Sequence, residues 1–245
     1  MSLQLDLPKM KGLFVTGTDT GVGKTLIAGG IANILRYNGK KVGVFKPVGS
    51  GCVHQHEGLI NHDAEFLREC SHCNFSLSEI NPVGYVTPAA PLVCEEFENR
   101  VVDFSKIKEA YARICAESEY VIVEGVGGVR VPISSGVDVL ELAKEFQMPV
   151  LIVTRPDLGT INHTLLTIDA VRGAGLEIAG VVISGYDIDS AGLAEETLPG
   201  VLEEWGDVDV LSIVPRDEES SVEENRLGQE VLESLSDLSW QDVCA

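Results

Sequence analysis

Short apolar runs of strand length recur along the 245-residue chain, and segments of helix length separate them. The runs cover residues 13–15, 42–45, 120–123, 150–153, 179–183 and 210–213. They are nearly continuous in Val, Ile and Leu rather than alternating with polar residues, which is typical of strands buried on both faces. The pattern therefore predicts a parallel sheet at the centre of the molecule.

Apolar residues at helical spacing occupy the segments between these runs. The predicted helices cover residues 25–37, 103–118, 138–146, 162–174, 191–205 and 223–235. This alternation predicts the α/β class, with a doubly wound, mostly parallel sheet flanked by helices, in a single domain over residues 1–245. Residues 47–91 are the least regular stretch, rich in Gly, His, Pro and Ser, and we expect active-site loops there.

The most informative motif lies between the first predicted strand and the first predicted helix. Residues 17–25 read Gly-Thr-Asp-Thr-Gly-Val-Gly-Lys-Thr, a glycine-rich turn at a helix N-terminus. Its backbone amides would cradle phosphates, Lys24 would reach the terminal phosphates, and the Thr25 hydroxyl would bind Mg²⁺. The motif predicts a fold of the P-loop NTPase type that binds ATP and Mg²⁺.

The spacing of this loop departs from the usual phosphate-loop motif, which would place a glycine at Thr18. The leading glycine is Gly17 instead, so the loop is lengthened and marks a particular branch of these enzymes. The Lys-Gly-Gly opening of the partitioning ATPases is missing from the sequence, which argues against relatives that form filaments or segregate DNA.

The chain has a formal net charge of −20 and a pI near 4.5. Such a field repels phosphate backbones and anionic lipid, so nucleic acid and membrane surfaces are not expected partners. Residues 187–245 hold 17 acidic residues and two arginines, so most of this charge belongs to the last quarter.

The six cysteines are too sparse for a disulfide framework. Neither a membrane-spanning run nor a secretion signal is evident in the sequence. We therefore expect a cytoplasmic protein.

Four further motifs follow the phosphate loop. They are Lys-Pro-Val-Gly-Ser-Gly at 46–51, Asn-His-Asp-Ala at 61–64, Val-Glu-Gly-Val-Gly-Gly at 123–128 and Gly-Thr-Ile-Asn-His at 159–163. Together with the phosphate loop they resemble the dethiobiotin synthetase family over residues 11–186. The resemblance implies an ATP-dependent ligase of biotin biosynthesis that closes the ureido ring of dethiobiotin from 7,8-diaminononanoate and CO2. A carbamate would attack the γ-phosphate, and the second amine would displace phosphate from the resulting anhydride.

The resemblance also assigns roles to individual residues. Lys24, Lys46 and Thr20 would be catalytic, because bringing an anionic carbamate to a triphosphate requires fixed positive charge. Ser50 would hold the diamine or its carbamate. Mg²⁺ would bind the hard oxygen donors of Thr25, Asp63 and Glu124. The residues implied in nucleotide binding are Gly21, Val22, Gly23, Lys24, Thr25, Leu26, Asp63, Glu124, Gly125, Val126, Gly127, Ser184, Pro215, Arg216 and Asp217.

The turn that contains Gly159, Thr160 and Asn162 would receive the distal carboxylate of the substrate. In the family this turn comes from the neighbouring subunit, which implies a homodimer with active sites at the interface. Two positions depart from the family pattern: Gly21 stands where some members carry Glu, and Ser184 stands where Asn often reads the adenine. Selectivity for ATP over other triphosphates therefore stays open.

Several features have alternative interpretations. Asp63 would also serve as a helix N-cap, and Thr160 and Asn162 are ordinary capping residues. Histidines and cysteines gather within residues 52–73, where Cys70-Ser71-His72-Cys73 has the spacing of metal ligands, so a transition-metal site is conceivable. The alternative function is that of a nucleotide-switched ATPase or binding protein of the partitioning or metallochaperone type.

Overall fold

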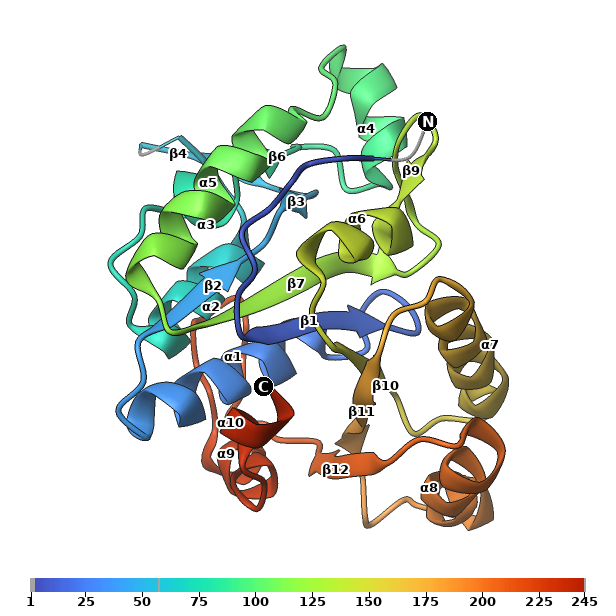
Figure 1. Cartoon of the computed structure of the whole chain (residues 1–245). Helices are drawn as coiled ribbons and strands as arrows, with labels where there is room; N and C mark the ends of the chain where they lie inside the picture. Colours follow the sequence, from blue (N-terminus) through green and yellow to red (C-terminus); the bar gives the residue numbers. More distant parts are fainter. Residues whose placement is uncertain (1–2, 57, 245) are drawn as a thin grey trace.

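The computed structural model describes residues 3–56 and 58–244. A six-stranded sheet crosses the molecule in the order β12-β11-β10-β1-β7-β2, and every neighbouring pair is parallel (Figure 1). The strands are β1 (Gly12–Gly17), β2 (Val42–Phe45), β7 (Tyr120–Gly128), β10 (Val150–Thr154), β11 (Ile178–Tyr186) and β12 (Val210–Pro215). Each predicted apolar run lies in one of these strands, so the predicted doubly wound sheet is confirmed.

Helices cover both faces of the sheet, as the continuous apolar strands require (Figure 1). One layer contains α1 (Lys24–Tyr37), α2 (His62–Ser71), α9 (Gln229–Ser236) and α10 (Trp240–Val243). The other contains α5 (Phe104–Glu117), α6 (Val139–Phe146), α7 (Thr160–Gly173) and α8 (Leu193–Gly206). The short helix α3 (Leu77–Ile80) packs against α5, and α4 (Pro91–Glu98) packs against a small hairpin.

Three pairs of short strands lie outside the main sheet. They are the parallel pair β3 (Val48–Gly49) and β6 (Val83–Gly84), and the antiparallel pairs β4 (Val53–Gln55) with β5 (Gly58–Ile60) and β8 (Pro132–Ser134) with β9 (Val137–Asp138). The stretch 47–91, predicted only as irregular, therefore contains short strands together with α2 and α3. These strands are too short to give a readable hydrophobic period.

Polar side chains fix the starts of several helices at the positions that the sequence indicates. The Asp103 carboxylate accepts hydrogen bonds from the amides of Ser105 and Lys106 at 3.1 Å, and Asp138 accepts one from Glu141 at 2.9 Å. Each cap satisfies amides that have no partner within the first helical turn. The predicted starts of α5 and α6 are therefore correct to within one residue.

The predicted helix over residues 223–235 is wrong in its first half. Ser221 and Arg226 exchange backbone hydrogen bonds of 2.9 and 2.8 Å, and Asn225 adopts a φ of 54°, so the chain reverses direction there. Helix α9 begins only at Gln229. The preceding residue, Gly228, lies so close to Asp217 that a β-carbon at position 228 would collide with the Asp217 carboxylate. The reversal depends on contacts with residues earlier in the chain, which a periodic pattern does not register.

The residue after the C-terminal helix α10 is hydrogen-bonded to the N-terminal end of β1. The amide of Gly12 donates to the carbonyl of Cys244 at 3.0 Å. Trp240 is fully buried, and its Nε1 donates to the carbonyl of Leu235 at 2.7 Å. The phosphate loop begins at the opposite end of β1. The contacts of α10 therefore stabilise the fold and lie away from the phosphate loop.

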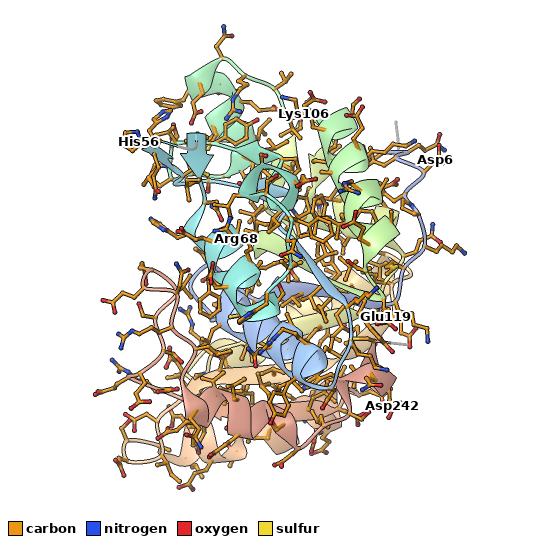
Figure 2. All side chains as sticks on the ribbon, turned by 90° about the vertical axis from the view of Figure 1, so that its left-hand side faces the viewer. Asp6, His56, Arg68, Lys106, Glu119 and Asp242 are labelled. Atoms are coloured by element: carbon orange, nitrogen blue, oxygen red, sulfur yellow. The ribbon has the colours of Figure 1, made fainter. Side chains whose placement is uncertain are left out.

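The acidic C-terminal quarter forms the outside of one end of the molecule. In Figure 2 its ribbon, in red tones, occupies the lower part, with many side chains pointing away from the protein. Glu203, Glu204, Glu218 and Glu219 are all exposed. The acidic side chains of this quarter therefore form a solvated surface. No helix in the described part of the chain has both the length and the apolar character needed to cross a membrane.

Candidate active site

The predicted site residues converge where the strand order reverses direction. Strand β1 lies between β7 and β10, so the chain crosses from β1 to β2 in one direction and later to β10 in the other. Loops separate at this point and leave a crevice at the carboxyl ends of the strands. The structure has a cleft of about 680 Å³ there. It is lined by Thr20, Gly21, Gly23, Lys24, Thr25, Leu26, Lys46, Ser50, Asp63, Pro88, Ala89, Ala90, Glu124, Val126, Gly127, Val131, Val222 and Glu223.

The phosphate loop joins β1 to α1 and forms one wall of this cleft. Gly23, at the N-cap of α1, has a φ of 94°, a left-handed conformation that favours glycine. Lys24 is buried, and its Nζ donates to the carbonyl of Asp19 at 2.9 Å across the loop. Burial lowers the pKa of Lys24 to about 8, although Glu124 and Asp63 act in the opposite direction. The lysine therefore still carries positive charge at neutral pH.

Lys46 lies at the centre of a buried charged cluster. It follows the last residue of β2, and its Nζ is 2.6 Å from Glu124 Oε1, 2.7 Å from Asp63 Oδ2 and 3.1 Å from the carbonyl of Gly125. Burial favours the neutral amine, but the two carboxylates outweigh it and raise the pKa of Lys46 above its ordinary value. The structure thus holds a permanent cation on the floor of the cleft.

The two carboxylates of the cluster differ in their surroundings. Burial raises the pKa of Glu124, whereas Lys46 outweighs burial at Asp63 and holds the pKa of that carboxyl below its ordinary value. Glu124 Oε1 also accepts a hydrogen bond from Thr25 Oγ1 at 2.9 Å, while Glu124 Oε2 is buried without a hydrogen-bond partner. A buried carboxylate oxygen with no donor needs a compensating charge. The hard oxygens of Thr25, Asp63 and Glu124 fit a divalent cation such as Mg²⁺.

Helix α2 presents Asp63 to this cluster, and the alternative interpretation of Asp63 as an N-cap is wrong. The cap is Asn61, whose side chain accepts a hydrogen bond from the amide of Ala64 at 3.2 Å. Asp63 lies in the first turn, where its side chain turns to Lys46. In the sequence motif Asn-His-Asp, the first residue therefore caps helix α2 and the third residue pairs with Lys46.

Four residues predicted to bind the nucleotide, Ser184, Pro215, Arg216 and Asp217, lie outside the described lining of the cleft. Ser184 is buried against the phosphate loop, so close that a β-carbon on Gly23 would collide with its Oγ. The amide of Arg216 donates to the carbonyl of Tyr186 at 2.9 Å, and Asp217 accepts a hydrogen bond from the amide of Glu219 at 2.8 Å. Pro215 ends β12. Val222 and Glu223, which follow β12 in the sequence, line the cleft instead.

Sequence reasoning missed several residues that line the cleft. The tight reversal at 221–226 carries Val222 and Glu223 to it, and the segment before α4 contributes Pro88, Ala89 and Ala90. Pro91 at the first position of α4 was the available signal for a helix start there. The reversal gave no comparable signal in the sequence.

Of the glycines predicted beside the phosphates, Gly127 lines the cleft, and the carbonyl of Gly125 accepts a hydrogen bond from Lys46. Val22 is buried beneath the loop.

The start of α7 lies outside the described lining of the cleft in its own chain. Gly159, with a φ of 95°, is the N-cap, so the capping interpretation of Thr160 and Asn162 is wrong. Asn162 is exposed. Thr160 is buried, and its Oγ1 lies 2.6 Å from Thr154 Oγ1, which directs the hydroxyl into the protein rather than toward a ligand. Free backbone amides and the exposed Asn162 side chain are the polar groups that this turn offers at its surface.

The described part of the cysteine- and histidine-rich segment brings no set of metal ligands together. Across residues 3–56 and 58–244, His, Cys, Asp and Glu side chains form no group of three or more that could hold a metal ion. All six cysteines are free. Cys70 is buried on α2, with its Sγ near Gly29 of α1, so it serves helix packing.

The thiols of Cys70 and Cys73 should react at very different rates. Burial raises the pKa of Cys70 to about 12, and a thiol must ionise to react, whereas Cys73 is partly exposed. We expect Cys73→Ser to remove the rapid labelling of position 73 by a thiol reagent at pH 8, and Cys70→Ser to leave that labelling intact. Peptide mapping of the labelled native protein checks this. Rapid labelling of Cys70 would contradict the packing described for α1 and α2.

The fold is shared with proteins of known structure. A family model described as AAA domain matches residues 11–224. The cell division ATPase MinD of Pyrococcus furiosus superimposes with a TM-score of 0.59 over 95% of this chain and 98% of that chain, at 16% identity. A chain of the MinC:MinD cell division protein complex of Aquifex aeolicus gives a TM-score of 0.58 over 96% of this chain and 94% of that chain, at 15% identity. At these identities the likeness shows the fold alone. The fold and the phosphate loop define a P-loop NTPase.

Relatives in sequence narrow this class. The ATP-dependent dethiobiotin synthetase BioD of Bacillus subtilis is 40% identical over 84% of this chain and 88% of its own length. Proteins with the same name in Thermodesulfovibrio yellowstonii and Methanococcus vannielii are 38% and 39% identical, over 83% and 82% of this chain and 88% and 92% of theirs. The chain belongs to the dethiobiotin synthetase family.

Proposed function

We propose that this protein catalyses the ATP-dependent closure of the ureido ring of dethiobiotin from 7,8-diaminononanoate and CO2. Relatives that cover most of the chain carry the name of this activity. The observation that carries the proposal in the structure is the Lys46 cluster, a buried cation held by Asp63 and Glu124 on the floor of a cleft that the phosphate loop also lines.

The proposed reaction joins two anions, and the cleft provides the charge to do so. One amine of the substrate adds to CO2 and loses a proton, which gives a carbamate. A carbamate oxygen bonds to the γ-phosphorus as the bond to ADP breaks, and the second amine then attacks the carbonyl carbon as phosphate leaves. Lys24 and Lys46 both line the cleft and would stabilise the negative charge that gathers on the transferring group. Thr20 and Ser50 would donate hydrogen bonds from the same walls.

ATP would lie along the phosphate loop, with its phosphates against the backbone amides at the start of α1. Thr25, Asp63 and Glu124 would hold Mg²⁺, which when bound neutralises phosphate charge. Glu124 supports this assignment because one of its buried oxygens has no hydrogen-bond partner. Val222 and Glu223 would border the base or ribose, since they line the cleft beyond the loop.

The protein would act as a homodimer, with the first turn of α7 completing the active site of the neighbouring subunit. This turn lies outside the described lining of its own cleft, and the exposed Leu158 and Asn162 place it at the surface. Its free amides would bind the distal carboxylate of the substrate.

A coupled assay of ADP release tests the proposed function. We expect turnover only when ATP, Mg²⁺, 7,8-diaminononanoate and bicarbonate are all present, with dethiobiotin identified by mass spectrometry. A nucleotide-switched binding protein would instead hydrolyse ATP slowly whether or not the diamine is present. Diamine-independent hydrolysis, with no dethiobiotin formed, would overturn the proposal.

A further inference from the structure

Four threonine hydroxyls form a cluster beside the phosphate loop, in which Thr154, Thr160 and Thr164 are buried and Thr18 is partly buried. Thr154, the last residue of β10, lies at its centre, with its Oγ1 3.1 Å from Thr18 Oγ1, 2.6 Å from Thr160 Oγ1 and 2.9 Å from Thr164 Oγ1. A hydroxyl has one hydrogen to donate and two lone pairs to accept, so three partners use its full capacity. Thr154 and Thr164 are completely buried, and water does not replace these contacts.

Thr154 joins two segments that are far apart in the sequence and have different proposed roles. Thr18 belongs to the phosphate loop, whereas Thr160 is the first residue of α7. The loop is held against the end of β10 in two further places. The amide of Thr18 donates to the carbonyl of Val153 at 3.0 Å, and Arg155 lies 3.4 Å from the carboxylate of Asp19. The carbonyl of Asp19 in turn accepts the hydrogen bond from Lys24 Nζ.

We propose that Thr154 is a positioning residue that holds both the phosphate loop and the first turn of α7 through its hydroxyl. It touches neither nucleotide nor substrate. Loss of the hydroxyl leaves the buried oxygens of Thr160 and Thr164 without their partner, so both segments must adjust to find new ones. The role in diamine binding rests on the proposed function, because it assumes that the α7 turn receives the substrate carboxylate. The role in nucleotide binding does not.

The test compares Thr154→Val, which keeps the shape and removes the hydroxyl, with Thr154→Ser, which keeps the hydroxyl. We expect Thr154→Val to raise the Kd for a non-hydrolysable ATP analogue and the KM for 7,8-diaminononanoate, each by about fivefold or more, because net hydrogen-bond contributions are of this size. The kcat should change little, since the Lys46 cluster is untouched. Thr154→Ser should restore both constants.

Thr167→Val is the matched control. Thr167 is also buried on α7, but its hydroxyl donates to the carbonyl of His163 in the same helix at 2.8 Å. This variant loses a buried hydroxyl without disturbing the cluster, so both constants should match those of the parent protein. If Thr154→Val does not fold, Thr18→Val tests the nucleotide branch alone and should raise the Kd for the analogue.

Two results would overturn the proposal. They are unchanged binding constants in Thr154→Val, whether or not kcat falls, and equal effects of the valine and serine variants. Failure of the proposed function would look different. The parent protein would then show no diamine-dependent turnover, and the Kd for the ATP analogue would still report on Thr154.

Discussion

Replacing Lys46 with alanine should reduce kcat by a factor on the order of 10²–10³, the usual cost of removing one preorganised group that stabilises developing charge. The Nζ of Lys46 is buried within 2.7 Å of both Asp63 and Glu124, and alanine leaves these two carboxylates without this cation. Lys46→Arg should also be poorly active, since the larger guanidinium does not fit between these two carboxylates. Steady-state ADP release measures both effects.

The fold should survive this substitution. Removing one partner of a buried ion pair often costs about 3–5 kcal/mol, because a charge is left behind. Here burial raises the pKa of Glu124, and loss of Lys46 would raise it further, so this carboxyl is more easily protonated and the cost is reduced. Circular dichroism and thermal unfolding check this.

Lys41→Ala is the matched control for Lys46→Ala. Lys41 directly precedes β2, at the opposite end of the strand from Lys46, and its side chain is exposed. Its substitution should leave kcat unchanged. A kcat near that of the parent protein in Lys46→Ala would refute the catalytic role of Lys46.

Replacing Gly23 with alanine should weaken nucleotide binding about thirtyfold or more, because two independent costs add, left-handed strain of roughly 1–3 kcal/mol and overpacking of similar size. Gly23 has a φ of 94°, and a β-carbon there would collide with Ser184 Oγ. Isothermal titration with a non-hydrolysable ATP analogue measures the loss.

Two further variants separate these costs. Gly21→Ala brings left-handed strain alone, since Gly21 has a φ of 74° and open space around its Cα, so its effect should be smaller. Combining Gly23→Ala with Ser184→Gly removes the collision and should restore part of the affinity lost in Gly23→Ala, measured against Ser184→Gly alone. No recovery in the double variant would show that the contact between Gly23 and Ser184 is not what limits the loop.

The sequence predicted the sheet and the centre of the site for one shared reason. Lys46 follows a buried strand, Glu124 lies near the end of another, and parallel strands bring these ends to a single edge. Even so, the apolar run at 120–123 underestimates β7, which continues to Gly128 because Gly17 of β1 pairs with it. Glu124 is therefore inside a strand rather than after one.

The errors have a different origin. The reversal at 221–226 is stabilised by its own backbone pairing and by Gly228 against Asp217, and the inward direction of Thr160 is set by Thr154, which precedes it by six residues. Acidic residues at helical spacing and a threonine at a helix start are compatible with several local structures. Only the packed neighbours choose among them, so these details require the tertiary structure.

The position of β1 in the sheet has a consequence for how the protein folds. The first strand of the sequence pairs with β7 and β10, so that Phe14 lies opposite Val123 on one side and Val150 on the other. Contacts between residues this distant in sequence slow folding, because a long loop must close before they form. During synthesis, the phosphate loop would lack one of the two strands that flank β1 until β10 has left the ribosome. The phosphate loop would therefore be synthesised early and become ordered late.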